Sequence, residues 1–374
     1  MEFTYCVPCL FGLEGPVGDE LRRMGLAEVR PENGRVRFSG GWSAMAKANI
    51  GLRCGERVLI ELGSFPAETF DALFEGVRAL PWECIIPKDG AFPVKGHSLN
   101  SALHSVPDCQ RIIKKAVAAR LGAKYSLQWL PENGAVYQIQ FAIMKDMAVL
   151  YLDTSGAGLH KRGYRPAAVA APLRETLAAA MVGLARYRGR DDFCDPFCGS
   201  GTIAIEAALR AKNRAPGLNR PFAAEKWPVL PAAVWREARA EAIAGEFNGD
   251  YHIFASDIDA KAVELAQKNA RRAGVERLIA FSTADARQFS RTTERGVIVT
   301  NPPYGERILE KKQAEALYQD FGAALRGKEN WKLYLLSSHT EFERAFGQTA
   351  DKKRKLYNGM IQCALYMYNT LPAL

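Results

Sequence analysis

The 374-residue sequence lacks the features of a membrane or exported protein. It contains no run of about 18 apolar residues, so we expect no membrane-spanning helix. Its opening residues, MEFTYCVPCLFGLEGPVGDE, carry an early acid and no basic segment, unlike a secretory signal. We therefore expect a cytoplasmic protein.

Cysteine pairs with the spacing of a zinc site are also lacking. Cys6 and Cys9 form one C-x-x-C, and the rest of the eight cysteines are scattered. A zinc finger needs a second pair at a set distance, and cytosolic thiols stay reduced. We expect no bound metal, and we interpret the thiols as structural or incidental.

The composition is that of a globular protein with a basic excess. A single core stops growing at about 250 to 300 residues, so the chain is long enough for two or three domains. Hydrophobic residues make up 48% and charged residues 24%, which is an ordinary balance. The net charge of +9 favours a polyanionic partner, although many basic proteins have none.

One basic run suggests where such a partner binds. The segment RIIKKAVAARLGAK at 111–124 carries five basic residues and no acid. Its cations recur at helical spacing, as on a solvated helix face or on a helix that follows phosphates. Two further basic clusters, at 160–165 and 352–355, shift the balance toward nucleic acid.

Residues 1 to about 160 predict an α+β region without a βα repeat. The expected elements are a strand pair at 29–41 turning at 32–34, helices at 42–52, 69–80 and 111–124, strands at 57–62 and 91–95, and strands at 135–144 and 147–155 around a turn at 145–146. A glycine-rich linker is expected near 156–167.

After the linker, strands alternate with helices, which predicts a parallel doubly wound sheet. The expected strands are 192–195, 251–257, 278–285, 297–302 and 331–338, with helices at 168–186, 202–212, 260–272 and 313–325 and an edge strand at 359–369. In such sheets ligands bind outside the carboxyl ends of the strands, so the residues at those ends are the candidates.

The first strand end is the loop DPFCGSGT at 195–202. Glycines there permit positive φ and a close ligand, and the helix that follows offers free N–H groups. Tight strand-to-helix packing is an alternative explanation. The third glycine of the dinucleotide fingerprint and the lysine of a P-loop are absent, which disfavours a dehydrogenase and a nucleoside triphosphate.

The next two strand ends each carry an acid. Asp257 is placed to accept hydrogen bonds from two ribose hydroxyls, whereas Asp259 is expected to cap the helix at 260–272. Asp285 can accept from an adenine amino group, although a lone acid there can also be a turn former. Together these ends predict an adenosine-containing cofactor.

The fourth end is Asn301-Pro302-Pro303-Tyr304, directly after an apolar β-branched strand. The Asn301 oxygen and the Pro302 carbonyl can each accept one N–H of an exocyclic amine, and the prolines fix the carbonyl direction. Tyr304 offers a face for a base that has left its stack. A proline-rich turn is the structural alternative, but the other three ends argue against it.

These motifs, together with GLHKRGYR, APLRETLAAA and AAEKWP, resemble the class I S-adenosylmethionine-dependent methyltransferases of the THUMP-domain RNA group. The resemblance covers nearly the whole chain and is specific in its second half. It implies a Rossmann-like methyltransferase domain at 158–374, preceded by a ferredoxin-like segment at 1–45 and a THUMP-like RNA-binding domain at 46–157. S-adenosylmethionine is the implied cofactor, and S-adenosylhomocysteine the product.

The resemblance also assigns roles, with 172–176 closing over the methionine end of the cofactor. The implied cofactor-binding residues are Asp195, Phe197, Cys198, Gly199, Ser200, Gly201, Thr202, Asp257, Ile258, Asp285, Ala286, Leu173 and Thr176. The implied catalytic residues are Asn301, Pro302, Pro303 and Tyr304. The candidate RNA-binding residues are Arg111, Lys114, Lys115, Arg120, Lys124, Lys161, Arg162 and Arg165.

The motifs leave the acceptor base open. Similarity to bacterial 23S rRNA guanine-N2 methyltransferases favours guanine N2 in 23S rRNA. Adenine N6 in RNA or DNA is the alternative, because both bases present an aromatic amine. A non-catalytic RNA-binding protein is disfavoured, since Asp257, Asn301 and the glycines are all retained.

Overall fold

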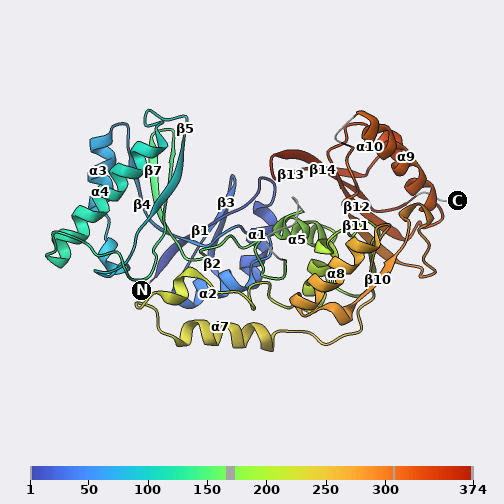
Figure 1. Ribbon diagram of the computed structural model, residues 1–374, viewed down its shortest axis with the longest axis horizontal. Helices are drawn as coiled ribbons and strands as arrows, with labels where there is room; N and C mark the ends of the chain where they lie inside the picture. Colours follow the sequence, from blue (N-terminus) through green and yellow to red (C-terminus); the bar gives the residue numbers. More distant parts are fainter. Residues whose placement is uncertain (1, 166–172, 306–307, 372–374) are drawn as a thin grey trace.

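The computed structural model describes residues 2–165, 173–305 and 308–371 and contains two seven-stranded sheets. Figure 1 shows the chain laid out along its long axis. Helices α3 and α4 and strands β5 and β7 lie at one end, β1 to β3 with α1 and α2 in the middle, and the green-to-red second half at the other end.

The first sheet has the order β2-β3-β1-β4-β7-β6-β5. Its strands are β1 (Phe3–Pro8), β2 (Ala27–Glu32), β3 (Arg35–Gly40), β4 (Leu59–Pro66), β5 (Val94–Leu99), β6 (Ile139–Met144) and β7 (Met147–Asp153). Its helices are α1 (Glu14–Arg23), α2 (Trp42–Gly51), α3 (Phe70–Ala79) and α4 (Val106–Tyr125). Only β5 and β6 run parallel among these strands, so the predicted α+β character is confirmed.

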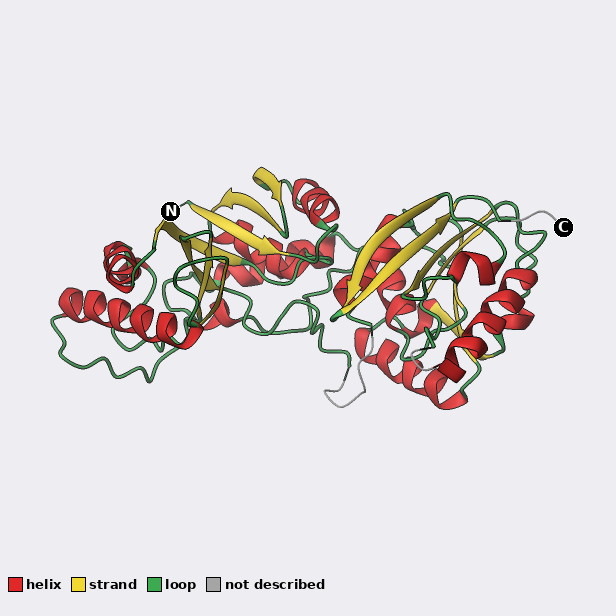
Figure 2. Cartoon of the chain, turned by 90° about the horizontal axis from the view of Figure 1, so that it is seen from above, coloured by secondary structure: helices red, strands yellow, loops and turns green. Residues whose placement is uncertain are grey.

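The second sheet has the order β10-β9-β8-β11-β12-β14-β13. Figure 2 shows its strands in the half of the molecule that ends at the C-terminus, with helices packed beside them. Its strands are β8 (Asp192–Asp195), β9 (Ile253–Asp257), β10 (Ile279–Thr283), β11 (Gly296–Thr300), β12 (Trp331–Ser337), β13 (Lys352–Asn358) and β14 (Ile361–Tyr368). The helices are α5 (Glu175–Leu184), α6 (Thr202–Ala211), α7 (Ala233–Ala244), α8 (Ala260–Ala273), α9 (Ile308–Ala324) and α10 (Phe342–Phe346).

This order confirms the predicted doubly wound sheet and locates its switch point. From β8, the strand order continues to β9 and β10 on one side of the sheet and to β11 and β12 on the other side. All five of these strands are parallel to one another. The crevice between the carboxyl ends of β8 and β11 is therefore where a ligand is expected.

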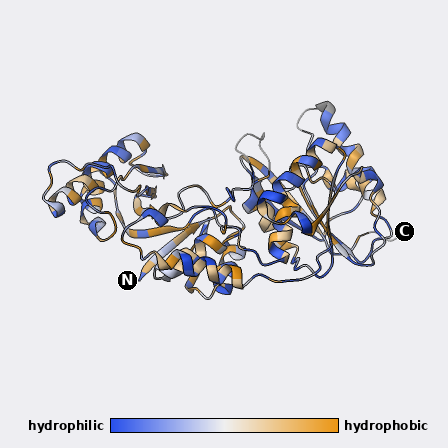
Figure 3. Cartoon of the chain, turned by 60° about the horizontal axis from the view of Figure 1, so that its bottom comes forward, coloured by the Kyte–Doolittle hydropathy of each residue, from blue (hydrophilic) through white to orange (hydrophobic). Residues whose placement is uncertain are grey.

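Each face of this sheet has its own core. Val297 and Val299 belong to the larger cluster, which includes α5, α6 and α8 residues, whereas Ile298 belongs to the cluster with Tyr318 and Phe321 of α9. This alternation follows from the two-residue period of a strand, and it makes a continuous apolar run suitable for a strand buried on both faces. In Figure 3 the helices carry both blue and orange segments, as expected for helices with one polar and one apolar face.

Several sequence predictions need correction. Strand β4 begins two residues later than expected and runs on to Pro66, and β5 lies at 94–99 instead of 91–95. Of the helix predicted at 168–186, residues 168–172 lie outside the described residues, and the described part begins only at Glu175. The segment 359–369 contributes β14, but the edge strand is β13, which was read only as a basic cluster.

None of the described helices is long and apolar enough to cross a membrane. Among the described residues, no group of three or more His, Cys, Asp or Glu side chains is placed to hold a metal ion. Burial raises the pKa of Cys6 and of Cys9 to about 12, so neither thiol of the C-x-x-C ionises readily.

Candidate cofactor and substrate site

A cavity of about 800 Å³ opens at the carboxyl ends of β8, β9, β10 and β11. We call it the motif cavity, because all four strand-end motifs contribute to it. Its lining residues are Arg174, Pro196, Phe197, Gly199, Asp257, Ile258, Asp285, Ala286, Arg287, Asn301, Pro302, Pro303, Tyr304, Leu317, Asn358, Gly359 and Ile361. A volume of this size is typical of small-molecule and cofactor sites.

A buried hydrogen bond joins the two central strands at the switch point. Asp195 at the end of β8 is 1% exposed, and its Oδ1 accepts from the Thr300 hydroxyl at 2.7 Å. Its Oδ2 is buried without a partner in the described structure. Burial raises the pKa of Asp195 to about 7, against the opposing effect of the Thr300 hydrogen bond.

The two glycines of the loop after β8 serve different purposes. Gly201 has φ +81°, and a Cβ there would lie 2.8 Å from the Cβ of Ala266 on α8. Gly199 has φ +49°, but a Cβ there would meet no heavy atom within 4 Å. Gly201 is thus needed for helix packing, whereas Gly199 presents its backbone to the open cavity.

Asp257 shapes this loop from the neighbouring strand. One carboxylate oxygen accepts from the Gly199 N–H at 2.9 Å, and the other accepts from the Asp259 N–H at 3.0 Å. The side chain of Asp259 accepts from the Lys261 N–H at 2.9 Å, which confirms its predicted role as the cap of α8. Ile258, between the two acids, is 65% exposed on the cavity wall.

Asp285 on the opposite wall is already engaged by its own loop. Arg287 pairs with its carboxylate at 2.6 Å, and the Arg287 N–H donates to it at 2.9 Å. The Arg287 hydrogen bonds hold the pKa of Asp285 below its usual value. Asp285 is therefore an ionised acceptor at the edge of the cavity.

The Asn-Pro-Pro-Tyr turn is held by two tyrosine hydroxyls. The Tyr304 hydroxyl donates to the Asn301 Oδ1, and the Tyr318 hydroxyl of α9 donates to the Pro303 carbonyl at 2.6 Å. The Pro302 carbonyl has no partner among the described residues. Asn301, Pro302, Pro303 and Tyr304 thus all line the cavity, with the Asn301 amide held next to the Tyr304 ring.

Comparison with known proteins agrees with this geometry. Residues 162–367 match the family described as RMKL-like, methyltransferase domain, residues 4–59 match the RlmL ferredoxin-like domain, and residues 67–153 match the THUMP domain. A Bacillus subtilis protein named "Putative RNA methyltransferase YpsC" is 45% identical over 98% of this chain and 96% of its own length.

The chain belongs to the RMKL-like methyltransferase family.

Solved structures and a longer relative extend the comparison. A Listeria monocytogenes protein described as "a predicted N6-adenine-specific DNA methylase" has TM-score 0.94 and 45% identity, covering 98% of this chain and 96% of its own. SMU.472, solved with S-adenosylhomocysteine, has TM-score 0.94 and 40% identity, covering 98% of each chain. The "Ribosomal RNA large subunit methyltransferase K/L" of Psychromonas ingrahamii is 33% identical over 99% of this chain but only 50% of its own length.

These findings confirm the predicted enzyme class, fold and cofactor: this RMKL-like protein is a methyltransferase that depends on S-adenosylmethionine. Structures below 25% identity, such as TrmN of Thermus thermophilus at 22% and TM-score 0.70, share the fold alone.

Seven of the predicted cofactor-binding residues do not line the motif cavity of this RMKL-like chain. They are Asp195, Cys198, Ser200, Gly201, Thr202, Leu173 and Thr176. Thr176 instead donates to Glu56 at 2.7 Å, and its hydroxyl joins α5 to the loop before β4. Pro172 lies outside the described residues. The loop that contains Ser200 is held by Asn269 of α8, whose side-chain amide donates to the Ser200 carbonyl at 2.9 Å.

Most of the far wall of the motif cavity was not predicted. Arg174, before α5, falls within the predicted segment 172–176, but Leu317 on α9 and Asn358, Gly359 and Ile361 at the turn between β13 and β14 were not among the predicted site residues. The turn residues lie 54 to 60 positions beyond the Asn-Pro-Pro-Tyr motif, and the pairing of β14 with β12 brings them near. The glycine-containing turn Asn358-Gly359 between two alternating runs was the available signal for a hairpin.

The candidate RNA-binding residues fall into two groups. On α4, Lys114 pairs with Glu132 at 2.6 Å and Arg120 with Glu83 at 2.6 Å, while Arg111 pairs with Asp108. Lys115 and Lys124 have no acidic partner in the described part of the chain, although Lys115 lies over the Phe74 ring. Three of the five cations of this helix are therefore neutralised by ion pairs within the protein.

The second group lies near the linker, and only Lys161 is exposed there. Arg162 is 4% exposed and donates to the Leu159 carbonyl and to Glu206. Arg165 pairs with Glu175 at 2.6 Å and donates to the Leu173 carbonyl at 3.2 Å. These two arginines tie the linker to the catalytic domain, and we do not include them in an RNA-binding surface.

Proposed function

We propose that this enzyme methylates an exocyclic amine of an RNA base held in the motif cavity, with guanine N2 of 23S rRNA as the first candidate. The observation that carries the proposal is the Asn301-Pro302-Pro303-Tyr304 turn, which faces Asp257, Ile258 and Asp285 across one cavity. An amine acceptor and an adenosine-containing donor would meet there.

The cavity residues fit S-adenosylmethionine. The open space at Gly199 admits a ligand against the backbone, and Asp257 has the position for the ribose hydroxyls. Ile258 offers an apolar face for the adenine, and Asp285 an ionised acceptor for its amino group. The bound cofactor supplies a methyl group on a cationic sulfonium, which these carboxylates do not repel.

The turn provides what a conjugated amine needs. The lone pair of such an amine is delocalised into the ring, so it is a weak nucleophile. Oδ1 of Asn301 and the free Pro302 carbonyl would accept its two N–H groups and favour sp³ geometry at nitrogen. The bound cofactor would supply the methyl group to the amine nitrogen, and the nitrogen, held by these two acceptors, would release one proton to solvent.

The tyrosines fix this arrangement. Because the Tyr318 hydroxyl occupies the Pro303 carbonyl, the turn cannot rotate without losing that hydrogen bond. The Tyr304 hydroxyl orients the Asn301 amide, and its ring lines the cavity where a flipped base would stack. Burial raises the pKa of Tyr304, so the hydroxyl remains a donor.

The names of the relatives support RNA as the substrate and are compatible with two acceptor bases. One relative is named for large-subunit ribosomal RNA and one for RNA in general, which favours 23S rRNA. The Listeria structure is described as an adenine-N6 DNA methylase, so adenine N6 is the second candidate. The THUMP match argues for RNA over DNA, because DNA methylation needs no such domain.

Methylation of 23S rRNA in vitro tests the proposal. Unmodified transcribed 23S rRNA is incubated with the enzyme and methyl-labelled cofactor, then digested to nucleosides for mass spectrometry. We expect labelled N2-methylguanosine. Labelled N6-methyladenosine would instead establish the second candidate, and label at neither guanine N2 nor adenine N6 would contradict both.

A further inference from the structure

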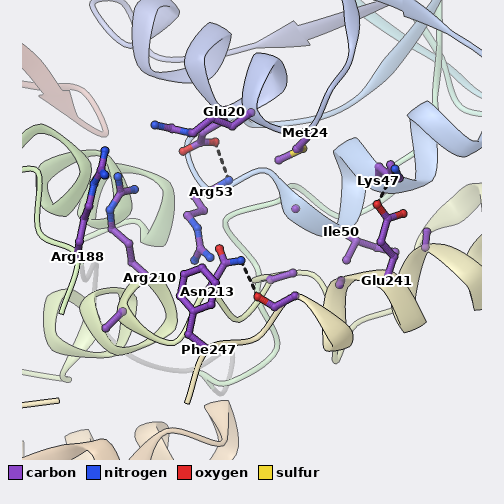
Figure 4. Close-up of a pocket in the computed structure, with 17 residues that line it drawn as sticks. Glu20, Met24, Lys47, Ile50, Arg53, Arg188, Arg210, Asn213, Glu241 and Phe247 are labelled. Carbon is purple, nitrogen blue, oxygen red and sulfur yellow. Dashed lines mark hydrogen bonds and ion pairs between the residues drawn. The ribbon is translucent and has the colours of Figure 1, made fainter. Parts of the chain in front are cut away.

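Two adjoining cavities lie between the first and the second sheet, on the side away from the motif cavity. They measure about 600 and 590 Å³ and share Glu20, Arg23 and Arg210 in their walls. We call them together the interdomain groove. Figure 4 shows the first cavity, with Arg188 and Arg210 side by side and Arg53 pointing in from the loop after α2.

Six cations of the groove have neither an ion pair nor a side-chain hydrogen bond among the described residues. They are Arg23, Arg186, Arg188, Lys332, Lys352 and Arg354. They come from α1, the segment between α5 and β8, β12 and β13. Elements from both halves of the chain thus bring unneutralised charge to one place.

Each acidic residue of the groove already has a hydrogen-bond or ion-pair partner. Glu20 accepts from the backbone N–H groups of Arg53 and Cys54 at 2.9 and 3.2 Å. Asp19 pairs with Arg22 at 3.1 Å, and Glu241 pairs with Lys47 at 2.7 Å. Glu20 still attracts Arg53 and Arg210 through its charge, whereas the six cations named above have no ion pair within the described protein.

Two more arginines line the groove, Arg53 buried and Arg210 half-buried. Arg53 is only 9% exposed, and its Nη1 has no hydrogen-bond partner in the described part of the chain. Burial lowers the pKa of Arg210; the charge of Glu20 opposes this shift, and the charges of Arg23 and Arg188 add to it. An anion in the groove would relieve this repulsion.

The position of the groove relates it to the motif cavity. Lys352 and Arg354 lie at the start of β13, whereas Asn358 at its end lines the motif cavity. A seven-residue strand spans about 20 Å, so one edge strand connects the two regions. In Figure 1, β13 lies at the centre of the molecule, between the two halves.

We propose that the interdomain groove binds the sugar–phosphate backbone of the substrate RNA, about 20 Å from the base that enters the motif cavity. The inference rests on the proposed RNA substrate and adds a separate contact region to it. One small anion needs two or three cations. Six cations spread over two adjoining cavities match a row of phosphates instead.

Lysine on an edge strand also has a role without any partner, because it blocks edge-to-edge aggregation. Protection against aggregation would explain the lysines of β13, but it does not explain why cations from α1 and β12 line the same groove. Lys353, which alternates to the other face of β13, does have a partner, Glu343 at 2.7 Å. Lys355, on the same face as Lys353, has no ion pair among the described residues and lies 5.5 Å from the centre of the Tyr357 ring. On β13 the groove itself is lined by two cations without an ion pair, Lys352 and Arg354.

Charge reversal tests the groove. The variant Lys332→Glu/Lys352→Glu changes two exposed cations of the groove. The control Arg272→Glu/Arg277→Glu makes the same change in charge beside β10, at the opposite edge of the sheet. Binding of labelled, transcribed 23S rRNA is measured between about 50 and 200 mM salt, and S-adenosylhomocysteine binding is measured by calorimetry.

We expect the groove variant to bind RNA about tenfold more weakly and to lower the slope of log K against log salt by about 1.5. The control and the cofactor affinity should stay unchanged. Equal losses in both variants would overturn the proposal, because they would report overall charge. It would also fail if the groove variant lost only inorganic-phosphate binding and kept its RNA affinity.

These outcomes are separable from the proposed reaction. Methyl transfer to 23S rRNA without any effect of the groove variant would reject the groove and keep the proposed function. Groove-dependent RNA binding without methylation of 23S rRNA would keep the groove and reject the proposed substrate.

Discussion

The two ends of the second sheet carry opposite chemistry. At the carboxyl ends, the motif cavity presents carboxylates, an amide and apolar walls. At the amino ends, the interdomain groove presents six cations without a partner among the described residues. The first suits a sulfonium donor and a neutral base, and the second suits phosphates. Methyl transfer and binding of the RNA backbone are therefore assigned to opposite ends of one sheet.

The difference predicts separate responses to mutation. Changes in the motif cavity should alter the rate of methyl transfer without altering the salt dependence of RNA binding. Changes in the groove should do the reverse, since phosphate contacts release counter-ions and base contacts do not.

Asn301→Ala should have the largest effect. It removes the amide oxygen that would orient the amine, and the loss of one such oriented group typically lowers kcat by about 10² to 10³. We expect RNA affinity, its salt slope and the affinity for S-adenosylhomocysteine to stay within a few-fold. Single-turnover methylation and calorimetry provide the measurements.

Asn301→Asp is the matched control, because it keeps an oxygen that can accept from Tyr304 and from the amine. It should lose less activity than the alanine variant. If Asn301→Ala instead abolished cofactor binding or folding, the turn would be structural, and the division between the two surfaces would lose its main support.

The second largest effect should come from Asp195 beside the motif cavity, whose carboxyl makes the stability of the protein depend on pH. The pKa of Asp195 is raised by burial to about 7, against about 3.9 in an unfolded chain. Between these values the folded state binds more protons, so stability should fall as pH rises through about 4 to 7. Asp195→Asn cannot titrate and should lose this dependence.

Thermal unfolding at pH 5, 6, 7 and 8 measures the effect. The wild type should lose several degrees more than Asp195→Asn across this range, because one pKa unit is worth about 1.4 kcal/mol. Lys332→Glu/Lys352→Glu should retain the wild-type profile, since it leaves Asp195 untouched. Parallel profiles for wild type and Asp195→Asn would show that Asp195 is ionised throughout.

The same comparison shows what sequence can reveal. The motif cavity was largely predictable, because parallel strands bring their carboxyl ends to one edge and each motif is contiguous. The groove was not, because Arg23, Arg186 and Lys332 are separated by well over a hundred positions and meet only through domain packing. Lys352 and Arg354 were noticed as charge, but their alternation with Lys353 became meaningful only once β13 was recognised as a strand.

The basic helix α4 shows the opposite error, in which sequence overstated a charge. Its run of cations suggested a phosphate-binding face, yet Glu132 and Glu83, from elsewhere in the chain, neutralise Lys114 and Arg120. Contiguous sequence cannot show partners that folding supplies. Counting unpaired cations in the folded chain is the better guide to where a polyanion binds.

Lys114→Glu/Lys115→Glu should therefore have the smallest effect. Of these two lysines, Lys114 is paired with Glu132, whereas Lys115 has no acidic partner among the described residues. The salt slope should therefore fall by about 0.7 to 0.9, as for one phosphate contact, against about twice that for the groove variant. The same rRNA binding titrations measure both. A fall as large as that of the groove variant would mean that the ion pair with Glu132 opens when RNA binds. The THUMP half would then hold the RNA as strongly as the interdomain groove does.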